Sequence, residues 1–329
     1  LQKYGYTHSS PRSFNNHFGV PISLSNLNQN HSYGVFEAGM SKAGEINHLT
    51  KIIKPNLAVI TNIAEAHIEN FSNIKGIAKA KGEIIDNIMK GGTVVLNRDD
   101  KFYNYFKIKA KIKKLNVVSF GRSKKSDINL IHESKKGKSK KLTIKIKNKK
   151  LKIKIENANV FNVLSSIAVL KALGLDYNKT TSLYGTFKPS EGRGKIHDIK
   201  RYNKKFKLID ESYNANPYSM KIALENFSEI KKLNSKKYLI IGDMLELGNK
   251  SEIYHSKLSK LINSSDIDKV FVKGEKSLFT YKKLKKKKRG NVFQTNEDID
   301  LVLKDIITNK DYLMIKGSNA TGLNTVSKA

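Results

Sequence analysis

Two side chains in the first quarter of the chain have the chemistry of ligands for a divalent cation. Glu37 follows the short apolar run 34–36, and His67 follows the apolar run 57–61. A carboxylate and a neutral imidazole suit a cation that also contacts nucleotide phosphates. Because ligands of α/β sheets bind beyond the carboxyl ends of the strands, both residues lie where such a site would form. Taken alone, each of them is more often a loop or capping residue than a metal ligand.

Lys81 is a third candidate because of its position in a predicted helix. The pattern of residues 74–89 predicts one helix with a stripe of isoleucines, and Lys81 lies on this stripe, four residues from Ile77 and four from Ile85. Burial there would lower the pKa of the amine. An uncharged amine can react with carbon dioxide to form a carbamate, which replaces a cation with an anionic oxygen ligand. The spacing alone favours a simpler alternative, a lysine whose stem covers apolar surface while its ammonium group reaches solvent.

The phosphate-binding loop of many ATPases, G-x-x-x-x-G-K-[ST], does not occur in the sequence. The chain also begins at Leu1 rather than at a methionine. We therefore expect an N-terminally truncated chain whose phosphate loop lies upstream, and little or no turnover by the polypeptide as it stands.

Composition limits the partners and the compartment that we expect. The formal net charge is +33, but only six of the 62 basic residues are arginine, the residue that favours base readout and phosphate clamps. We therefore expect no nucleic-acid partner, and a positive field that attracts small polyanions such as nucleotides. The absence of cysteine excludes disulfides and is compatible with the cytoplasm. No stretch approaches the roughly 20 apolar residues that span a bilayer, so no membrane span is expected.

Short apolar strands that alternate with helical patterns must position the candidate residues. They predict an α/β fold with a mostly parallel sheet and helices on both faces. From about residue 127 to 155 the apolar residues alternate with period two, which predicts a β-hairpin with a solvated, lysine-rich face. Helical spacing resumes at Val160, and Gly174 is the expected C-cap.

A second α/β unit follows the first. The loop-forming residues 187–192 place the boundary between two domains, 1–187 and 188–329. The basic run 282–289 is predicted to be a solvated segment. Strands of this second domain are predicted at 206–209, 238–241, 270–272 and 312–315.

Several strings resemble, in the same order and spacing, those of the Mur ligase family. In the first domain they are residues 13–21, 36–39, 44–46, 60–67, 80–84, 95–100 and 159–162, and in the second they are 191–193, 210–220, 242–248 with His255, and 316–318. The string Gly-Asp-Met-Leu-Glu-Leu-Gly at 242–248 is the most specific, and it resembles members that add D-alanyl-D-alanine. The resemblance covers nearly the whole chain. Departures from the family pattern stand at Arg12, Ser13, Ala158 and Glu211.

The resemblance implies a central ATPase domain followed by a Rossmann-like C-terminal domain, and an ATP-dependent ligase that uses Mg²⁺ and acts as a monomer. The implied reaction joins D-alanyl-D-alanine to UDP-N-acetylmuramoyl-tripeptide through an acyl phosphate, in peptidoglycan precursor synthesis. Two alternatives stay open. One is another Mur or folylpolyglutamate-type ligase, and the other is a basic nucleic-acid-binding protein. The third residue of the tripeptide is not specified by the sequence.

The resemblance also implies roles for individual residues. Glu37, His67 and Lys81 would be catalytic residues that hold the metal, with Lys81 as the carbamate. Residues that would bind ATP are Asn159, Arg193, Asp210, Asn214 and Asn216, and residues that would bind the other substrates are Asn15, Asn16 and Lys316.

Overall fold

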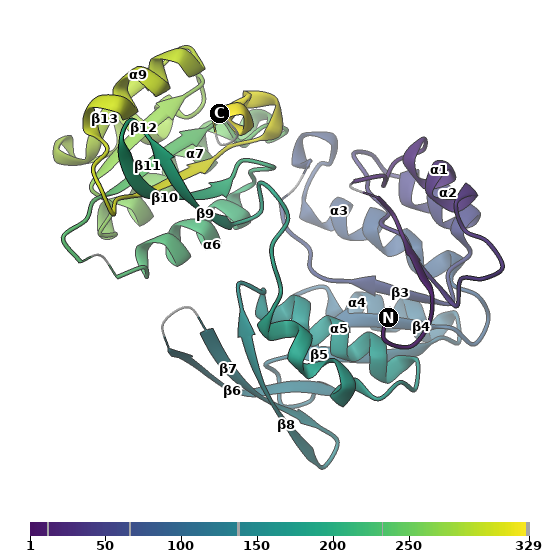
Figure 1. Cartoon of the computed structure of the whole chain (residues 1–329). Helices are drawn as coiled ribbons and strands as arrows, with labels where there is room; N and C mark the ends of the chain where they lie inside the picture. Colours follow the sequence, from purple (N-terminus) through teal and green to yellow (C-terminus); the bar gives the residue numbers. More distant parts are fainter. Residues whose placement is uncertain (12, 66, 137–138, 232, 327–329) are drawn as a thin grey trace. The chain divides into compact units, whose positions relative to one another are not determined.

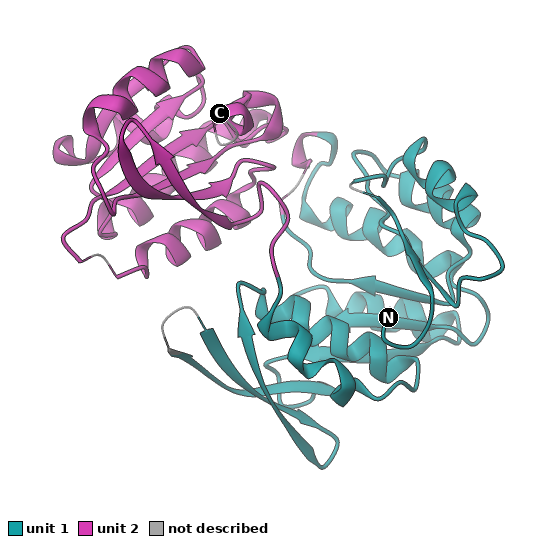
Figure 2. Cartoon of the chain, viewed as in Figure 1, with its two compact units in different colours: residues 1–64, 70–187 teal, residues 65–69, 188–329 magenta. Residues whose placement is uncertain are grey.

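The computed structural model describes residues 1–11, 13–65, 67–136, 139–231 and 233–326. Arg12 and Ala66, which belong to strings named above, lie outside the described residues. The chain divides into two compact units (Figure 2). Unit 1 comprises residues 1–64 and 70–187, and unit 2 comprises residues 65–69 and 188–329.

Unit 1 contains a six-stranded sheet in the order β3-β4-β5-β6-β7-β8 (Figure 1). The first four strands are parallel, and the last three form an antiparallel ladder. Within this ladder the predicted hairpin is present, with Leu142, Ile144 and Ile153 buried while most of the intervening lysines are exposed. The strands are β3 (Leu57–Ile60), β4 (Thr93–Asn97), β5 (Asn116–Gly121), β6 (Ile128–Lys136), β7 (Ser139–Ile146) and β8 (Lys149–Glu156).

Helices pack on both faces of this sheet. Val95 of β4 belongs to the hydrophobic core that α5 covers. Its two neighbours, Val94 and Leu96, do not belong to this core but are equally buried. Because successive side chains of a strand point to opposite faces, these neighbours pack on the other side, where α4 contacts β4 and β5. The helices of unit 1 are α1 (Gly19–Ser25), α2 (Glu45–Ile53), α3 (Ile74–Lys81), α4 (Tyr103–Ile112) and α5 (Val160–Ala172), with 3₁₀ turns η2 (Gly82–Asn87) and η3 (Tyr177–Gly185).

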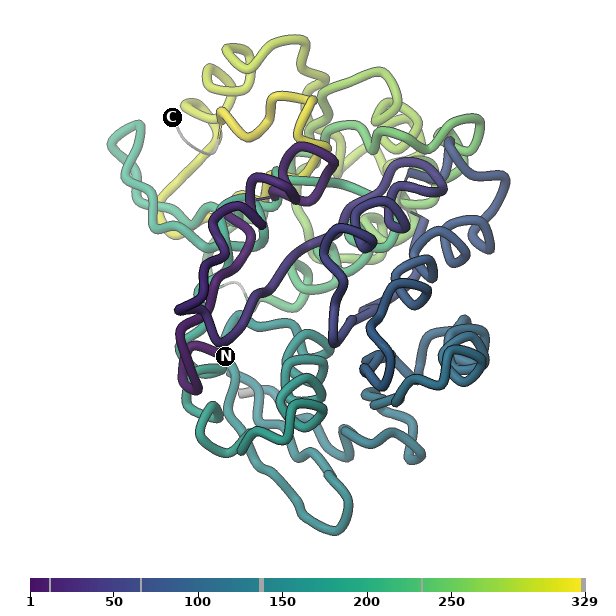
Figure 3. The backbone as a smooth tube through the Cα atoms, turned by 90° about the vertical axis from the view of Figure 1, so that its right-hand side faces the viewer, coloured from purple at the N-terminus to yellow at the C-terminus, as the bar shows by residue number. Residues whose placement is uncertain are grey.

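Two details of unit 1 differ from the sequence predictions. The strand before Glu37, β2 (Tyr33–Val35), does not join the main sheet but pairs with β1 (Thr7–Ser9) in a separate two-stranded parallel sheet, drawn in purple in Figure 3. The single helix predicted over 74–89 ends at Lys81 and continues as the 3₁₀ turn η2. The change occurs at Gly82, where a Cβ atom would lie 3.1 Å from the Phe106 ring. Glycine allows this close approach but favours a helix less than every other residue except proline.

Unit 2 has a six-stranded sheet in the order β13-β12-β11-β14-β10-β9, parallel except for the edge strand β9. The four predicted strands are all present as β10 (Lys204–Glu211), β11 (Lys237–Gly242), β12 (Lys269–Lys273) and β14 (Tyr312–Lys316). The sheet also contains β9 (Lys195–Arg201) and β13 (Arg289–Phe293).

The helices of unit 2 are α6 (Pro217–Ser228), α7 (Ser251–Ser264), α8 (Leu278–Lys282), α9 (Asn296–Ile306) and α10 (Leu323–Val326). Its shorter 3₁₀ turns are η4 (Gly248–Lys250), η5 (Lys286–Lys288) and η6 (Asn319–Thr321), and a further turn, η1 (Ile68–Asn70), begins in the segment 65–69 and ends at the first residue of the segment 70–187. Among the described residues, no helix is both long and apolar enough to cross a membrane.

The sequence predicted that the basic run 282–289 is solvated, but the structure buries one of its lysines. Lys288 is only 6% exposed, and its ammonium group donates to the carbonyls of Ser265 (2.8 Å) and Ile267 (2.6 Å). The lysine therefore satisfies buried carbonyl groups of the segment before β12, a role that its own neighbours in the sequence do not indicate.

Candidate active site

Glu37 is exposed after β2, and a neighbouring asparagine contacts it. Asn15 Nδ2 donates to Glu37 Oε1 over 2.9 Å. The two segments are held together because the Gly39 amide donates to the Asn15 carbonyl, and a Cβ on Gly39 would lie 2.9 Å from the Asn15 side chain. Asn16 instead bonds to the first residue of α1, since its Oδ1 accepts from the amide of Gly19 at 2.8 Å. Of the two asparagines, Asn15 is the one whose side chain reaches the predicted metal ligand.

Lys81 is half-buried at the end of α3. Its Nζ donates to the carbonyl of Asn62, just beyond β3, over 3.4 Å. Burial lowers the pKa of Lys81, and the nearby carboxylate of Asp100 offsets this in part. The same carboxylate accepts from the amide of Ile63 at 2.7 Å, which fixes it beside the strand end. A lowered pKa increases the fraction of neutral amine, the form that carbon dioxide can modify.

His67 belongs to the short segment 65–69, which is grouped with unit 2 rather than with unit 1. Its Nδ1 forms an ion pair with the Glu246 carboxylate, and both residues have left-handed backbones, with φ of 55° and 61°. Within unit 1, therefore, Glu37 and Lys81 occur without His67. The structure does not bring the three predicted metal ligands together in one unit.

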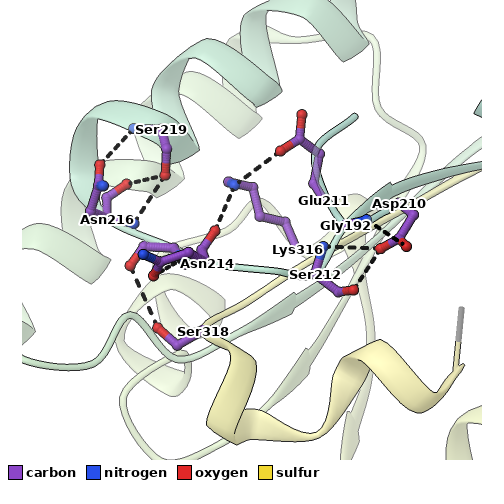
Figure 4. Close-up of polar contacts among 10 residues, drawn as sticks. Gly192, Asp210, Glu211, Ser212, Asn214, Asn216, Ser219, Lys316 and Ser318 are labelled. Atoms are coloured by element: carbon purple, nitrogen blue, oxygen red, sulfur yellow. Dashed lines mark hydrogen bonds and ion pairs between the residues drawn. The ribbon is translucent and has the colours of Figure 1, made fainter. Parts of the chain in front are cut away.

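The predicted residues of unit 2 converge on the ends of β10 and β14 (Figure 4). Lys316 is 2% exposed, and its Nζ donates to the Asn214 carbonyl at 3.0 Å and pairs with Glu211 Oε2 at 3.3 Å. Burial lowers the pKa of Lys316, although Glu211 opposes the shift. The lysine thus ties the last residue of β14 to the loop that follows β10.

The side chains of Asp210 and Asn216 hold this loop in its observed conformation. The buried carboxylate of Asp210 accepts from the amide of Gly192 (3.1 Å) and the hydroxyl of Ser212 (2.5 Å). Asn216 caps α6 in a capping box with Ser219. Both side chains therefore act within the chain rather than as free ligand contacts.

Arg193 and Asn159 are exposed. The Arg193 guanidinium lies 4.2 Å from the centre of the Tyr213 ring. Gly192 makes this arrangement possible, because its φ is 71° and a Cβ there would lie 2.7 Å from the Tyr213 side chain. Asn159 caps α5, since its Oδ1 accepts from the amide of Phe161 at 2.9 Å.

Two acidic residues and a histidine of unit 2 form a cluster that the sequence did not predict. Ligand atoms of Glu191, His197 and Asp210 all lie within 4.8 Å of one another. Glu191, however, also pairs with Lys195, and Asp210 is satisfied by the bonds described above. The cluster is therefore best explained by internal pairing.

His255 is a residue whose role the sequence did not reveal. It is 1% exposed, and its Nε2 accepts from the amide of Met244 at 2.9 Å while its Nδ1 lies 2.8 Å from the Ser251 carbonyl. This pattern requires a neutral ring with the proton on Nδ1. The loop that His255 holds is also bonded to the end of β14, because the Leu245 amide donates to Ser318 Oγ at 3.0 Å.

Sequence comparison connects both units to one family. The pattern of the Mur ligase middle domain matches residues 1–170, and that of the Mur ligase, glutamate ligase domain, matches residues 194–319. The chain belongs to the Mur ligase family. A curated relative of this Mur ligase is the UDP-N-acetylmuramoyl-tripeptide–D-alanyl-D-alanine ligase of Rickettsia prowazekii (strain Madrid E). The two are 34% identical over 328 residues, which cover 97% of this chain and 70% of the relative.

Solved structures agree with this assignment of the Mur ligase. MurF from Acinetobacter baumannii has a TM-score of 0.87 and 26% identity, over 100% of this chain and 71% of that one. The MurF ligase of Thermotoga maritima, solved in complex with ADP, has a TM-score of 0.85 over 100% of this chain and 74% of that one; at 23% identity it supports the fold alone. The predicted α/β architecture with its hairpin region is confirmed.

In this Mur ligase, we expect His255 to make unit 2 sensitive to mild acid. Burial lowers the pKa of His255 below the usual 6.5, so the unfolded chain takes up a proton more readily than the folded one. Stability is therefore complete above the unfolded value and is lost as the pH falls toward the folded pKa. Urea unfolding between about pH 5 and 7 should show this slope, and His255→Gln, which cannot titrate, should reduce it. An unchanged slope in the variant would assign the pH dependence to other groups.

Proposed function

We propose that this Mur ligase joins D-alanyl-D-alanine to UDP-N-acetylmuramoyl-tripeptide in an ATP-dependent reaction. The observation that carries the proposal is the 34% identity to a ligase of that name, which extends over 97% of the chain and so includes both units. The loop 243–248 supports it further, because this loop is fixed by His255 on one side and by Ser318 on the other. The two bonds hold the adjacent amides of Met244 and Leu245, and a loop fixed in this way can present a defined surface to a substrate.

The chain offers residues that fit ATP and Mg²⁺. Glu37 provides an exposed carboxylate, and Lys81 provides an amine whose lowered pKa favours a carbamate. With His67, these two would hold Mg²⁺, whose charge would offset that of the phosphoryl group being transferred. Arg193 and Asn214 are proposed to contact the nucleotide directly. Asn159, Asp210 and Asn216 are proposed to serve ATP binding by fixing the start of α5, the loop after β10 and the start of α6, respectively.

Asn15, Asn16 and Lys316 are proposed to serve the other substrates. Asn15 orients Glu37, and Asn16 fixes the start of α1 beside it. Lys316 holds the loop after β10 through Asn214 and Glu211. Because Lys316 is almost fully buried, its proposed role is to position this loop rather than to contact a large substrate.

The proposed reaction has two steps. The terminal carboxylate of the tripeptide attacks the γ-phosphorus of ATP, which gives an acyl phosphate and ADP. The amine of D-alanyl-D-alanine then attacks the acyl carbon, and the tetrahedral intermediate expels phosphate as the amine loses a proton. The residues of the chain hold the reacting groups in position and stabilise the charge that develops, which is the main contribution of proteins to phosphoryl transfer.

We further propose that residues 1–187 form the ATP-binding domain and residues 188–329 the C-terminal Rossmann-like domain. The enzyme is proposed to act in the cytoplasm as a monomer without a nucleic-acid partner. Lysine rather than arginine supplies nearly all of its positive charge, which supports the last point. Sedimentation of the protein alone and with duplex DNA at physiological salt would test both statements, and a dimer or a comigrating complex would contradict them.

An isotope experiment on the complete protein tests the proposed reaction. The terminal carboxylate of UDP-N-acetylmuramoyl-tripeptide is labelled with ¹⁸O and incubated with ATP and D-alanyl-D-alanine. An acyl phosphate predicts one ¹⁸O atom in each phosphate that is released, together with ADP. Labelled AMP would indicate an acyl adenylate instead, and label retained entirely in the amide product would contradict carboxylate activation.

A further inference from the structure

Unit 2 contains a pocket at the edge of its sheet that is remote from the residues discussed so far. The pocket has a volume of about 570 Å³ and lies where β10 and β14 begin, so Lys205 and Tyr312 line it. Asp210 and Lys316 are four to five residues further along the same two strands. At the rise of an extended strand this corresponds to roughly 13–17 Å. The pocket and the candidate ligase residues therefore lie at opposite ends of these strands.

Lysines dominate the lining of this pocket, which we call the lysine pocket. They are Lys200, Lys205, Lys207, Lys231 and Lys310, while the acidic residue of the lining is Asp198. Asp198 pairs with Lys207 at 2.5 Å. Among the described residues, no ion pair is seen for the other four lysines. The lining thus carries a surplus of four positive charges for which the described residues show no ion pair.

Two of these lysines face each other directly. In the antiparallel ladder of β9 and β10, Lys205 is the partner of Lys200, and both are exposed. Like charges directly opposite each other across two strands destabilise a sheet. An anion bound between them would convert this repulsion into two attractive contacts.

We propose that the lysine pocket binds a small phosphorylated molecule that carries at least two negative charges. The volume is that of a small-molecule site and is too small for a duplex or a folded protein. Lysine ammonium groups bind phosphate as point charges. The lysine stems and Tyr312 give the pocket an apolar surface that accommodates an uncharged part of the ligand. This site is distinct from the proposed ligase site.

Calorimetric titration with pyrophosphate tests the proposal. Lys200→Gln/Lys205→Gln should weaken binding about tenfold, since two charge-assisted contacts are lost. A matched control is Lys260→Gln/Lys283→Gln, which removes the same charge from exposed lysines of unit 2 outside the pocket and should change affinity less than about twofold.

Thermal unfolding without ligand gives a second measurement. Because the opposed lysines repel each other, Lys200→Gln/Lys205→Gln should raise the midpoint by about 1–3 °C. Pyrophosphate should then raise the midpoint of the unmodified protein by more than that of this variant. Equal weakening by both double variants would show diffuse attraction to a positively charged chain and would overturn the proposal. Loss of binding in Arg193→Gln, with binding retained in Lys200→Gln/Lys205→Gln, would place pyrophosphate at the nucleotide residues and would also overturn it.

Discussion

Replacing Lys81 with alanine should reduce amide-bond formation by the complete protein about 10²–10³-fold, the effect of losing one preorganised charge-stabilising group. The reason is that Lys81 combines partial burial, a lowered pKa and a position beside the end of β3, where its Nζ reaches the Asn62 carbonyl. An arginine at this position should not restore activity, because a guanidinium stays charged and cannot form the carbamate. The rate of ATP-dependent product formation measures the effect.

Lys79 provides the matched control for this experiment. It lies in the same last turn of α3 but is exposed, so Lys79→Ala should leave the rate nearly unchanged. The carbamate itself can be observed by ¹³C NMR after incubation with labelled bicarbonate, and its signal should be absent from Lys81→Ala. If Lys81→Ala kept more than half of the activity, or if the carbamate signal persisted in it, the proposed role of Lys81 would be wrong.

Lys316→Met is expected to destabilise unit 2 by about 2–4 kcal/mol, because it breaks a buried ion pair by removing one partner. The variant would leave the Glu211 carboxylate, whose side chain is 24% exposed, and the Asn214 carbonyl without their donor. Since Lys316 holds the loop after β10, activity should fall as well. Urea unfolding of the complete chain, followed by a probe in unit 2, measures the free energy.

Two further variants distinguish this explanation from a general effect of removing a lysine. Lys221→Met breaks an exposed pair with Glu225 on α6 and should cost less than about 0.5 kcal/mol. The double variant Lys316→Met/Glu211→Gln also removes the carboxylate charge that Lys316→Met leaves unpaired, so it should be more stable than Lys316→Met. A single variant as stable as Lys221→Met would show that the buried pair contributes little.

Much of the fold could be predicted from the sequence, because the spacing of apolar residues and the presence of capping residues determine many of its strands and helices. The period-two run over β7 and β8 and the helical spacing of α5 appear as expected, and the string before α6 contains its own cap in Asn216. The errors arise from contacts between residues distant in sequence. The helix α3 ends at Gly82, where the Phe106 ring approaches the backbone. Lys288 is buried because two carbonyls more than 20 residues earlier accept hydrogen bonds from its ammonium group.

The candidate site was predictable to a smaller extent. Spacing alone identified Lys81 as unusual, whereas the function of Glu37 or His67 could not be separated from that of an ordinary loop residue without the family resemblance. The role of His255 was not predictable from the sequence, since it depends on a bond to Met244 across a turn. The lysine pocket was missed as well, because its charges come from β9, β10 and two loops that meet only in the folded sheet.

The central claim is tested most directly by the choice of acceptor. The complete protein is incubated with ATP and UDP-N-acetylmuramoyl-tripeptide, and with D-alanyl-D-alanine or a series of free amino acids in parallel, and the products are identified by mass spectrometry. We predict ATP-dependent formation of the UDP-linked pentapeptide with the dipeptide, and no comparable product with any free amino acid. Extension by a free amino acid, without extension by D-alanyl-D-alanine, would contradict the proposed function.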